Sequence, residues 1–90
     1  MRLAQPDRQV FLAAHPDWEL EGESIKRTFQ LGDFAEAVSF LIRVGFLAEA
    51  ADHHPDIDVR WNKVTLVLST HSEGALTVKD TELAAAIDQL

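Results

Sequence analysis

The sequence predicts a single α+β domain, in which an antiparallel four-stranded sheet has helices packed on one face. Apolar and polar residues alternate over residues 57–61 and 64–68, which is typical of strands with one buried face. Apolar residues recur at helical spacing between residues 34 and 48. The chain has 90 residues, 47% of them hydrophobic, which is enough for one core only. The expected order is helix, strand, strand, helix, strand, strand, helix.

The first third of the chain predicts a short helix followed by two strands. The helix is expected from about Asp7 to Ala14, and it should stop before Pro16, because the residue before a proline avoids the helical conformation. Its apolar side is formed by Val10, Phe11 and Ala14. A strand end and a turn are expected over residues 19–24, and a second strand over residues 25–31.

A long central helix is predicted to start at Asp33. Asp33 and Glu36 have the spacing of a capping box, in which each side chain binds a free backbone N–H at the start of a helix. The helix should run to about Ala51 and pack deeply, because apolar residues cover a wide face of it. That face comprises Phe34, Val38, Phe40, Leu41, Val44, Gly45, Leu47 and Ala48.

The two alternating segments predict a hairpin with Asn62 and Lys63 as its tight turn. All apolar residues of the hairpin then lie on one face of the sheet. The expected apolar pairs are Trp61 with Val64, Val59 with Leu66, and Ile57 with Leu68. Extended outward, this register places His54 opposite His71.

The last segment predicts a helix that begins at Thr77. Thr77 and Asp80 repeat the capping-box spacing. Leu83, Ile87 and Leu90 continue at helical spacing to Leu90. We therefore expect these three side chains to face the core.

Charge and composition exclude several classes of function. The chain has 8 Lys and Arg against 15 Asp and Glu, a net charge of -7, so it repels nucleic-acid phosphates and anionic membrane surfaces. Binding to nucleic acid or to a membrane is not expected. There is no cysteine, which excludes disulfides and thiolate metal sites. We expect no signal peptide and no membrane span. We therefore expect a cytoplasmic location.

Three of the four histidines lie where the central helix and the hairpin end. His53 and His54 follow the central helix, and His71 follows the second strand of the hairpin. Imidazole exchanges protons near neutral pH, so converging histidines suit a reaction that both donates and accepts protons. Glu49 lies one helical turn before His53, where it could orient that imidazole. The sequence therefore indicates an acid–base site.

Two other interpretations of these histidines stay open. Adjacent histidines near a helix end are often exposed residues, because a positive charge is mildly favourable there. Three histidines could also bind zinc, although their spacing matches no recognised metal pattern. Activity that survives chelation would exclude the zinc site.

The segment from Glu49 to Asp56, with Asn62–Val64 and Leu68–His71, resembles the signature of the pterin-4a-carbinolamine dehydratases. The resemblance extends back to Trp18–Gly22 and forward to Asp80, nearly the whole chain. It implies dehydration of 4a-hydroxytetrahydrobiopterin, or a related 4a-hydroxy pterin, to the quinonoid dihydropterin. This reaction recycles the cofactor of aromatic amino acid hydroxylases, and it needs no metal or organic cofactor.

The resemblance also implies roles for individual residues. His53 and His71 match the family's acid–base positions and His54 a substrate-contacting one, so all three are expected at the catalytic centre. Glu49 and Pro55 are expected to support these histidines. The remaining pterin contacts would come from Asp52, Ser69, Thr70 and Ser72, with Trp18 and Asp80 lining the same pocket.

Members of this family also act without turnover. Some are dimerisation partners of a transcription factor, and some relatives assist the assembly of a carbon-fixing enzyme. The alternatives are therefore a non-enzymatic interaction or assembly protein, and a pterin-binding module. The complete histidine set favours the enzyme. The resemblance further implies a homodimer joined through the sheets or a homotetramer joined through helices, which suits the thin core of a small domain.

Overall fold

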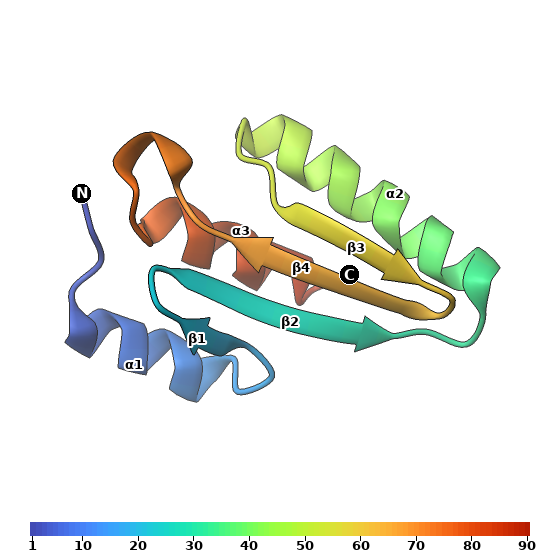
Figure 1. Cartoon of the computed structure of the whole chain (residues 1–90), viewed down its shortest axis with the longest axis horizontal. Coiled ribbons are helices and arrows are strands. Elements are labelled where there is room, and N and C mark those ends of the chain that lie inside the picture. Colours follow the sequence, from blue (N-terminus) through green and yellow to red (C-terminus); the bar gives the residue numbers. More distant parts are fainter.

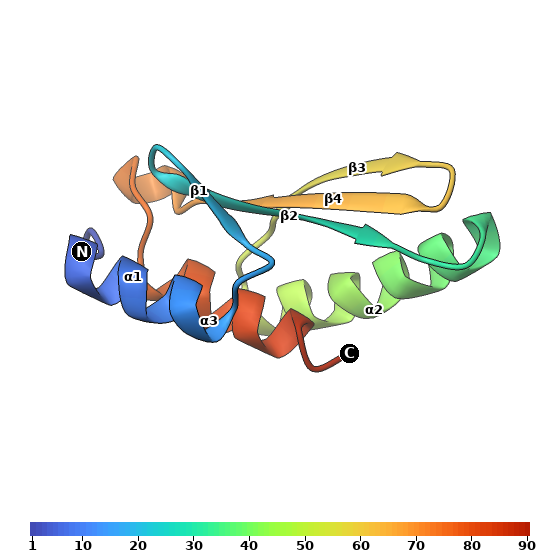
Figure 2. The same ribbon diagram turned by 90° about the horizontal axis from the view of Figure 1, so that it is seen from below.

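Helices and strands follow one another in the predicted order in the computed structural model, which describes residues 1–90 (Figure 1). The strands form one antiparallel sheet in the order β1-β2-β4-β3. All three α-helices lie on the same face of this sheet, and its other face is open (Figure 2). The predicted α+β class is therefore confirmed. The elements are α1 (Gln5–Ala14), β1 (Glu19–Glu21), β2 (Ser24–Gln30), α2 (Phe34–Ala51), β3 (Asp56–Arg60), β4 (Lys63–Leu68), the 3-10 helix η1 (His71–Glu73) and α3 (Val78–Ile87).

The core lies between the sheet and the helices. The central strand β4 buries every second residue completely, because those side chains face the helix layer. Helices α2 and α3 supply the opposite side of the core with small and branched side chains. The buried apolar residues of these three elements are Ala37, Val44, Ala48, Val64, Leu66, Leu68, Leu83, Ala84 and Ile87.

The hairpin differs from the predicted one in its turn and register. The turn is Trp61-Asn62, and Arg60 pairs with Lys63. Val59 therefore faces Val64 and Ile57 faces Leu66, a shift of two residues that leaves each side chain on its side of the sheet. Val59 packs against the core as expected, whereas Ile57 is 44% exposed on the edge strand. Trp61 sits in the turn at φ 50, where it is 69% exposed and pairs with no strand residue.

Helix α2 starts as predicted but is not deeply packed. The Asp33 side chain accepts a hydrogen bond from the Glu36 N–H at 2.8 Å, which is one half of the expected capping box. Apolar residues cover most of the helix surface apart from a polar strip of Glu36, Ser39 and Arg43, but only one side of the helix meets the sheet and α3. Phe34 and Gly45, which were expected to be buried, are exposed. Ile42 and Phe46 are exposed as well.

Two smaller expectations about burial also fail. Val10 and Ala14 of α1 are exposed, and the helix buries Arg8 together with Phe11 instead. Leu90 lies beyond the end of α3 and is 45% exposed. None of the helices has the length and apolar character needed to cross a membrane.

Candidate active site

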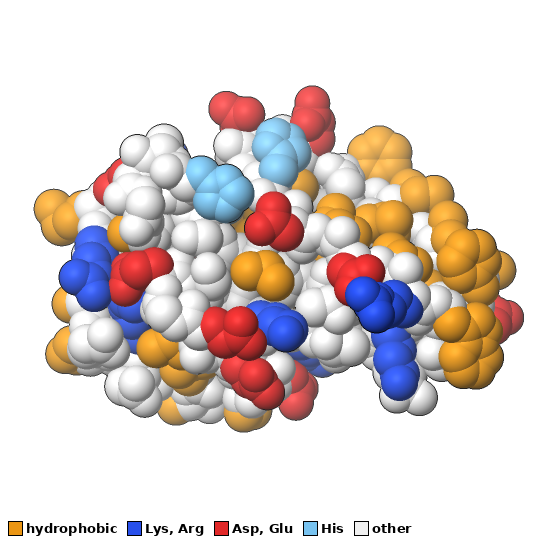
Figure 3. Space-filling model, viewed as in Figure 1, with side chains coloured by type: hydrophobic (Ala, Val, Ile, Leu, Met, Phe, Trp, Pro, Cys, Tyr) orange, Lys and Arg blue, Asp and Glu red, His pale blue; other side chains and the backbone are white.

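The predicted histidines come together at one end of the molecule. A polar hollow of about 380 Å³ lies where α2 and β4 end and α3 begins. Figure 3 shows histidine side chains gathered there on the open side of the sheet. The hollow is lined by Asp52, His53, His54, Ser69, Thr70, His71, Ser72 and Lys79.

The end of α2 decides where His53 and His54 point. Asp52 takes the left-handed conformation at φ 50 and ends the helix. The His53 N–H still donates to the Ala48 carbonyl at 3.1 Å, so the chain leaves the helix in a tight turn. The His53 side chain is 11% exposed and that of His54 is 60% exposed. The two adjacent imidazoles therefore have opposite surroundings.

A buried carboxylate holds His53 in place. Nε2 of His53 lies 2.5 Å from Oδ1 of Asp80, whose side chain is completely buried. The other oxygen, Oδ2, accepts hydrogen bonds from the Thr77 N–H and the Thr70 hydroxyl, both at 2.9 Å. The contact with Thr77 completes the predicted capping box of α3. One carboxylate therefore starts the helix and orients an imidazole of the hollow.

The partner of Glu49 differs from the expected one. Its Oε1 lies 3.0 Å from Nε2 of His54, and both side chains are largely exposed. Because the left-handed turn at Asp52 directs His53 inward, His54 remains beside the outer surface of α2. Pro55 follows this pair, is partly buried and leads into β3.

The expected pairing of His54 with His71 across the hairpin does not form. The pairing of β3 with β4 begins at Asp56 opposite Val67, and its register is shifted by two residues. His71 lies beyond the strand, in η1. The two histidines still line the same hollow, but loops bring them there and strand pairing does not.

A short loop presents His71. Thr70 and Ala75 form an isolated bridge, and Gly74 closes the loop at φ 60 with its N–H bound to the His71 carbonyl at 3.1 Å. A glycine suits this left-handed position because it has no side chain to clash. His71 and Ser72 are exposed on the tip of this loop.

Two residues expected in the pocket do not line it. Trp18 is 2% exposed, and its indole N–H donates to Asp88 at 2.9 Å, outside the hollow. Asp80 lies behind His53. In contrast, Lys79 lines the hollow and was missed. The sequence feature that could have identified Lys79 is its place in the first turn of a helix, where the helix dipole disfavours a positive charge. A residue in a locally unfavourable position is a candidate for a functional role.

A more apolar hollow of about 330 Å³ adjoins the polar one between α2 and α3. His53 and Lys79 line both hollows. The site therefore offers hydrogen-bonding groups on one side of His53 and apolar surface on the other. The remaining residues around the apolar hollow are Leu47, Ala50, Ala51, Glu82, Leu83 and Ala86.

The histidines are not arranged as metal ligands. Nowhere in the chain do three His, Asp or Glu side chains form a group that could hold a metal ion. His53 and His54 are instead paired with Asp80 and Glu49. This arrangement suits proton transfer, because a carboxylate fixes the orientation of an imidazole.

Known proteins match the whole chain. The sequence model of the family described as pterin 4 alpha carbinolamine dehydratase matches residues 1–90. A Chloroflexus aurantiacus protein with the provisional name pterin-4-alpha-carbinolamine dehydratase is 54% identical over 89 residues, which are 99% of this chain and 96% of that protein. Both matches extend over the fold and the site together.

Solved structures share the fold. A transcriptional coactivator/pterin dehydratase from Brucella melitensis is 32% identical, with a TM-score of 0.93 over 99% of this chain and 97% of that one. A pterin dehydratase-like protein described as a RuBisCO assembly factor in the alpha-carboxysome is 22% identical, with a TM-score of 0.65 over 80% and 83% of the two chains. The chain therefore belongs to the pterin-4a-carbinolamine dehydratase family.

Proposed function

We propose that this chain dehydrates 4a-hydroxytetrahydrobiopterin, or a related 4a-hydroxy pterin, by histidine acid–base catalysis. The observation that carries the proposal is the convergence of His53, His54 and His71 on one polar hollow, with Asp80 holding His53 from behind. The family match and the name of the Chloroflexus relative support the choice of substrate.

The reaction needs one proton donated and one removed. A protonated imidazole donates to the 4a hydroxyl as the bond between C4a and oxygen breaks, and the hydroxyl leaves as water. A neutral imidazole takes the proton from the neighbouring ring nitrogen, which leaves the quinonoid dihydropterin. Between turnovers the acid takes up a proton from solvent again, and the base releases the proton that it gained.

The surroundings of the histidines suggest how they divide this work. Asp80 compensates the positive charge that forms when His53 accepts a proton, so we assign the base to His53. His71 is exposed on its loop and is placed to donate. His54 would contact the substrate from the side of Glu49. Asp52, Ser69, Thr70 and Ser72 would hydrogen-bond the polar pterin ring.

A direct assay tests the proposal. Purified protein is mixed with a freshly generated 4a-hydroxytetrahydropterin, and the absorbance of the quinonoid product is followed. His53→Ala and His71→Ala should each lower kcat by about 10²-fold or more, as expected for the loss of an acid or a base. His15→Ala is the matched control, because this fourth histidine is bound to Asp88 outside the hollow. Full activity in both site variants would contradict the proposal.

A second function is supported by a separate observation. Hydrophobic side chains gather at one end of the molecule, over α2 and the turn between β3 and β4 (Figure 3). Ile42, Phe46 and Trp61 of these elements are 54%, 75% and 69% exposed. Exposed apolar surface of this kind often marks a protein interface. We propose that it joins copies of this chain into a dimer or tetramer, or binds a protein partner.

The two functions do not exclude each other. The descriptions of the Brucella and alpha-carboxysome proteins support a protein-binding role in addition to pterin chemistry. The polar hollow does not include the exposed side chains of Ile42, Phe46 or Trp61. Absence of pterin turnover, together with stoichiometric binding of a purified partner, would make the interaction the main function.

A further inference from the structure

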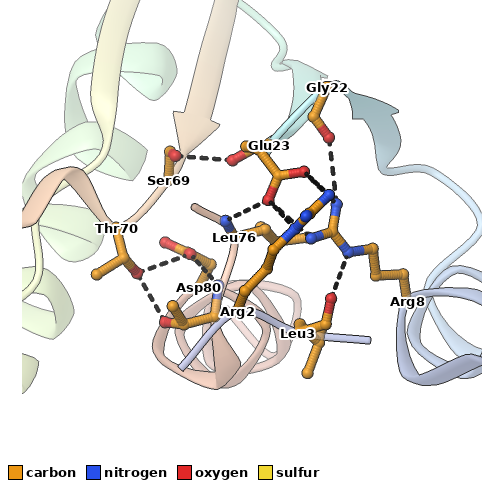
Figure 4. Close-up of polar contacts among 10 residues, drawn as sticks. Arg2, Leu3, Arg8, Gly22, Glu23, Ser69, Thr70, Leu76 and Asp80 are labelled. Atoms are coloured by element: carbon orange, nitrogen blue, oxygen red, sulfur yellow. Dashed lines mark hydrogen bonds and ion pairs between the residues drawn. The ribbon is translucent and has the colours of Figure 1, made fainter. Parts of the chain in front are cut away.

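One glutamate outside the hollow holds both ends of the loop that carries His71. Glu23 lies in the turn between β1 and β2, and its backbone carbonyl accepts a hydrogen bond from the Ser69 hydroxyl at 2.7 Å. Its Oε1 accepts a hydrogen bond from the Leu76 N–H at 3.3 Å. Figure 4 shows both contacts. The loop between these two points, residues 69–76, contains four of the residues that line the hollow.

Two arginines hold the Glu23 carboxylate itself. Arg8 is 1% exposed and donates from Nη2 to Oε1 at 2.8 Å and from Nη1 to Oε2 at 3.0 Å (Figure 4). Arg2 adds two more hydrogen bonds at 3.1 and 3.0 Å. The hydrogen bond from Arg8 is the main cause that lowers the pKa of Glu23 to about 2, so the carboxylate stays charged far below neutral pH.

The Arg8 guanidinium is fixed by the backbone as well as by Glu23. Its Nε donates to the Leu3 carbonyl at 2.8 Å, and Nη1 also reaches the Gly22 carbonyl at 3.3 Å. A bidentate pair of this kind has a defined geometry, because both groups are planar and each N–H has one acceptor. The position of Glu23 is therefore set by α1 and by the β1–β2 turn, which contribute nothing to the hollow.

We propose that Glu23 is a positioning residue of the candidate active site, which fixes His71 relative to His53 by binding both ends of the segment 69–76. The Asp80 network fixes His53 and Thr70 from α3, whereas Glu23 fixes the same loop from the sheet side. His71 itself makes no side-chain hydrogen bond to hold it, so its place depends on the backbone of this loop. The inference rests on the proposed dehydratase, in which that placement determines the rate.

Glu23→Gln tests the inference. The amide keeps the size of the side chain but cannot accept from both arginines and from Leu76 at once, so the hold on the Leu76 end of the segment weakens. The Ser69 hydroxyl keeps its partner, because that partner is the backbone carbonyl of residue 23. Because a misplacement of about 1 Å can cost up to about 10²-fold in rate, we expect kcat to fall about tenfold with a smaller change in KM. The matched control is Glu21→Gln in the same hairpin, since Glu21 is exposed and has only Lys26 near it, at 3.6 Å.

Two readouts do not require turnover. Hydrogen exchange of the Thr70, Gly74 and Ala75 amides should become about tenfold faster in Glu23→Gln, because these N–H groups are bonded within the loop. The imidazole NMR signals of His71 should shift, while those of His15 stay in place. Asp88→Asn serves as a second control, since it breaks a polar cluster that contacts His15, Trp18 and Arg27 but not the loop.

The outcomes separate the inference from the proposed function. If Glu23→Gln lowers stability but keeps the kcat, the loop exchange and the His71 signals of the wild type, Glu23 is a structural residue and the inference is wrong. Loosening of the loop without any loss of kcat would also overturn it. If the wild type has no dehydratase activity, the proposed function fails, and hydrogen exchange with the His71 signals then decides whether Glu23 positions the loop.

Discussion

Replacing Asp80 with asparagine probes the centre of the proposed site. Asp80 is completely buried and uses both carboxylate oxygens. Oδ1 faces His53, and Oδ2 accepts from the Thr77 N–H and the Thr70 hydroxyl. Asparagine has the same shape, but one of its two terminal groups is an NH₂ that donates and cannot accept. No orientation of the amide can therefore satisfy every contact of the carboxylate.

The size of the effect follows from these contacts. If the NH₂ group takes the place of Oδ2, two donors lose their acceptor, and the capping box of α3 opens. If it takes the place of Oδ1, it faces His53 and favours the wrong tautomer of the imidazole. A buried mismatch of this kind costs about 1–3 kcal/mol of unfolding free energy. Loss of the orienting carboxylate should lower kcat by about 10²-fold or more.

Two measurements on the same protein test this reasoning. Urea denaturation gives the unfolding free energy, and the absorbance assay with a 4a-hydroxytetrahydropterin gives kcat. Asp33→Ala is the control, because it removes the cap of α2 away from the hollow, at a cost of about 1 kcal/mol in stability. Its kcat should equal that of the wild type. An Asp80→Asn variant that keeps the wild-type kcat would refute the proposed role of Asp80.

Two further predictions concern acid stability and self-association. Glu23 has a pKa of about 2 in the folded protein against an ordinary value of 4.5, so its stabilising contribution is complete above that ordinary value and is lost as the pH falls towards 2. Glu23→Gln should abolish this part of the acid dependence in urea midpoints, and an unchanged dependence would contradict it. Phe46→Glu should leave the stability of the monomer within about 0.5 kcal/mol, because this side chain is 75% exposed. In light scattering it should lower the mass of the oligomer towards that of one chain, and an unchanged mass would exclude this face of α2 from the contact.

Local signals predicted the elements well because they act over a few residues. The capping box at Thr77 and Asp80 and the cap at Asp33 mark the starts of α3 and α2. The alternation in β4 gives the right buried face, since Leu66 and Leu68 are completely buried. Each of these signals is a hydrogen bond or a burial pattern that nearby residues decide by themselves.

The hairpin register could not be predicted from the same alternation. A shift by two residues keeps every side chain on its face, so the pattern is equally consistent with both registers. Only the turn residues could distinguish the two registers. Tryptophan is not a typical turn residue, so the sequence does not indicate that Trp61 adopts a positive φ. Helix α2 poses a similar problem, because apolar residues cover most of its surface and their pattern does not tell which part of it meets the sheet.

Convergence of the histidines was predicted, but their partners were not. Glu49 lies one helical turn before His53 in the sequence. Because the backbone turns at Asp52 in the left-handed conformation, the Glu49 side chain pairs with His54 instead. The true partner of His53 is 27 residues away in the sequence, at the start of another helix. Such a contact depends on how α2 and α3 pack against each other. The residue pattern within either helix does not predict that packing.

The double use of Asp80 has a consequence for how this site can vary. The carboxylate that closes the capping box is also the one that holds His53, so the first turn of α3 and the orientation of the imidazole cannot change independently. A substitution that kept an acceptor for the Thr77 N–H but not the second oxygen would keep the capping contact and release His53. The spacing of Thr77 and Asp80 in the sequence is that of an ordinary helix cap, and the burial of Asp80 beside a histidine is what supports a role for it in the proposed chemistry.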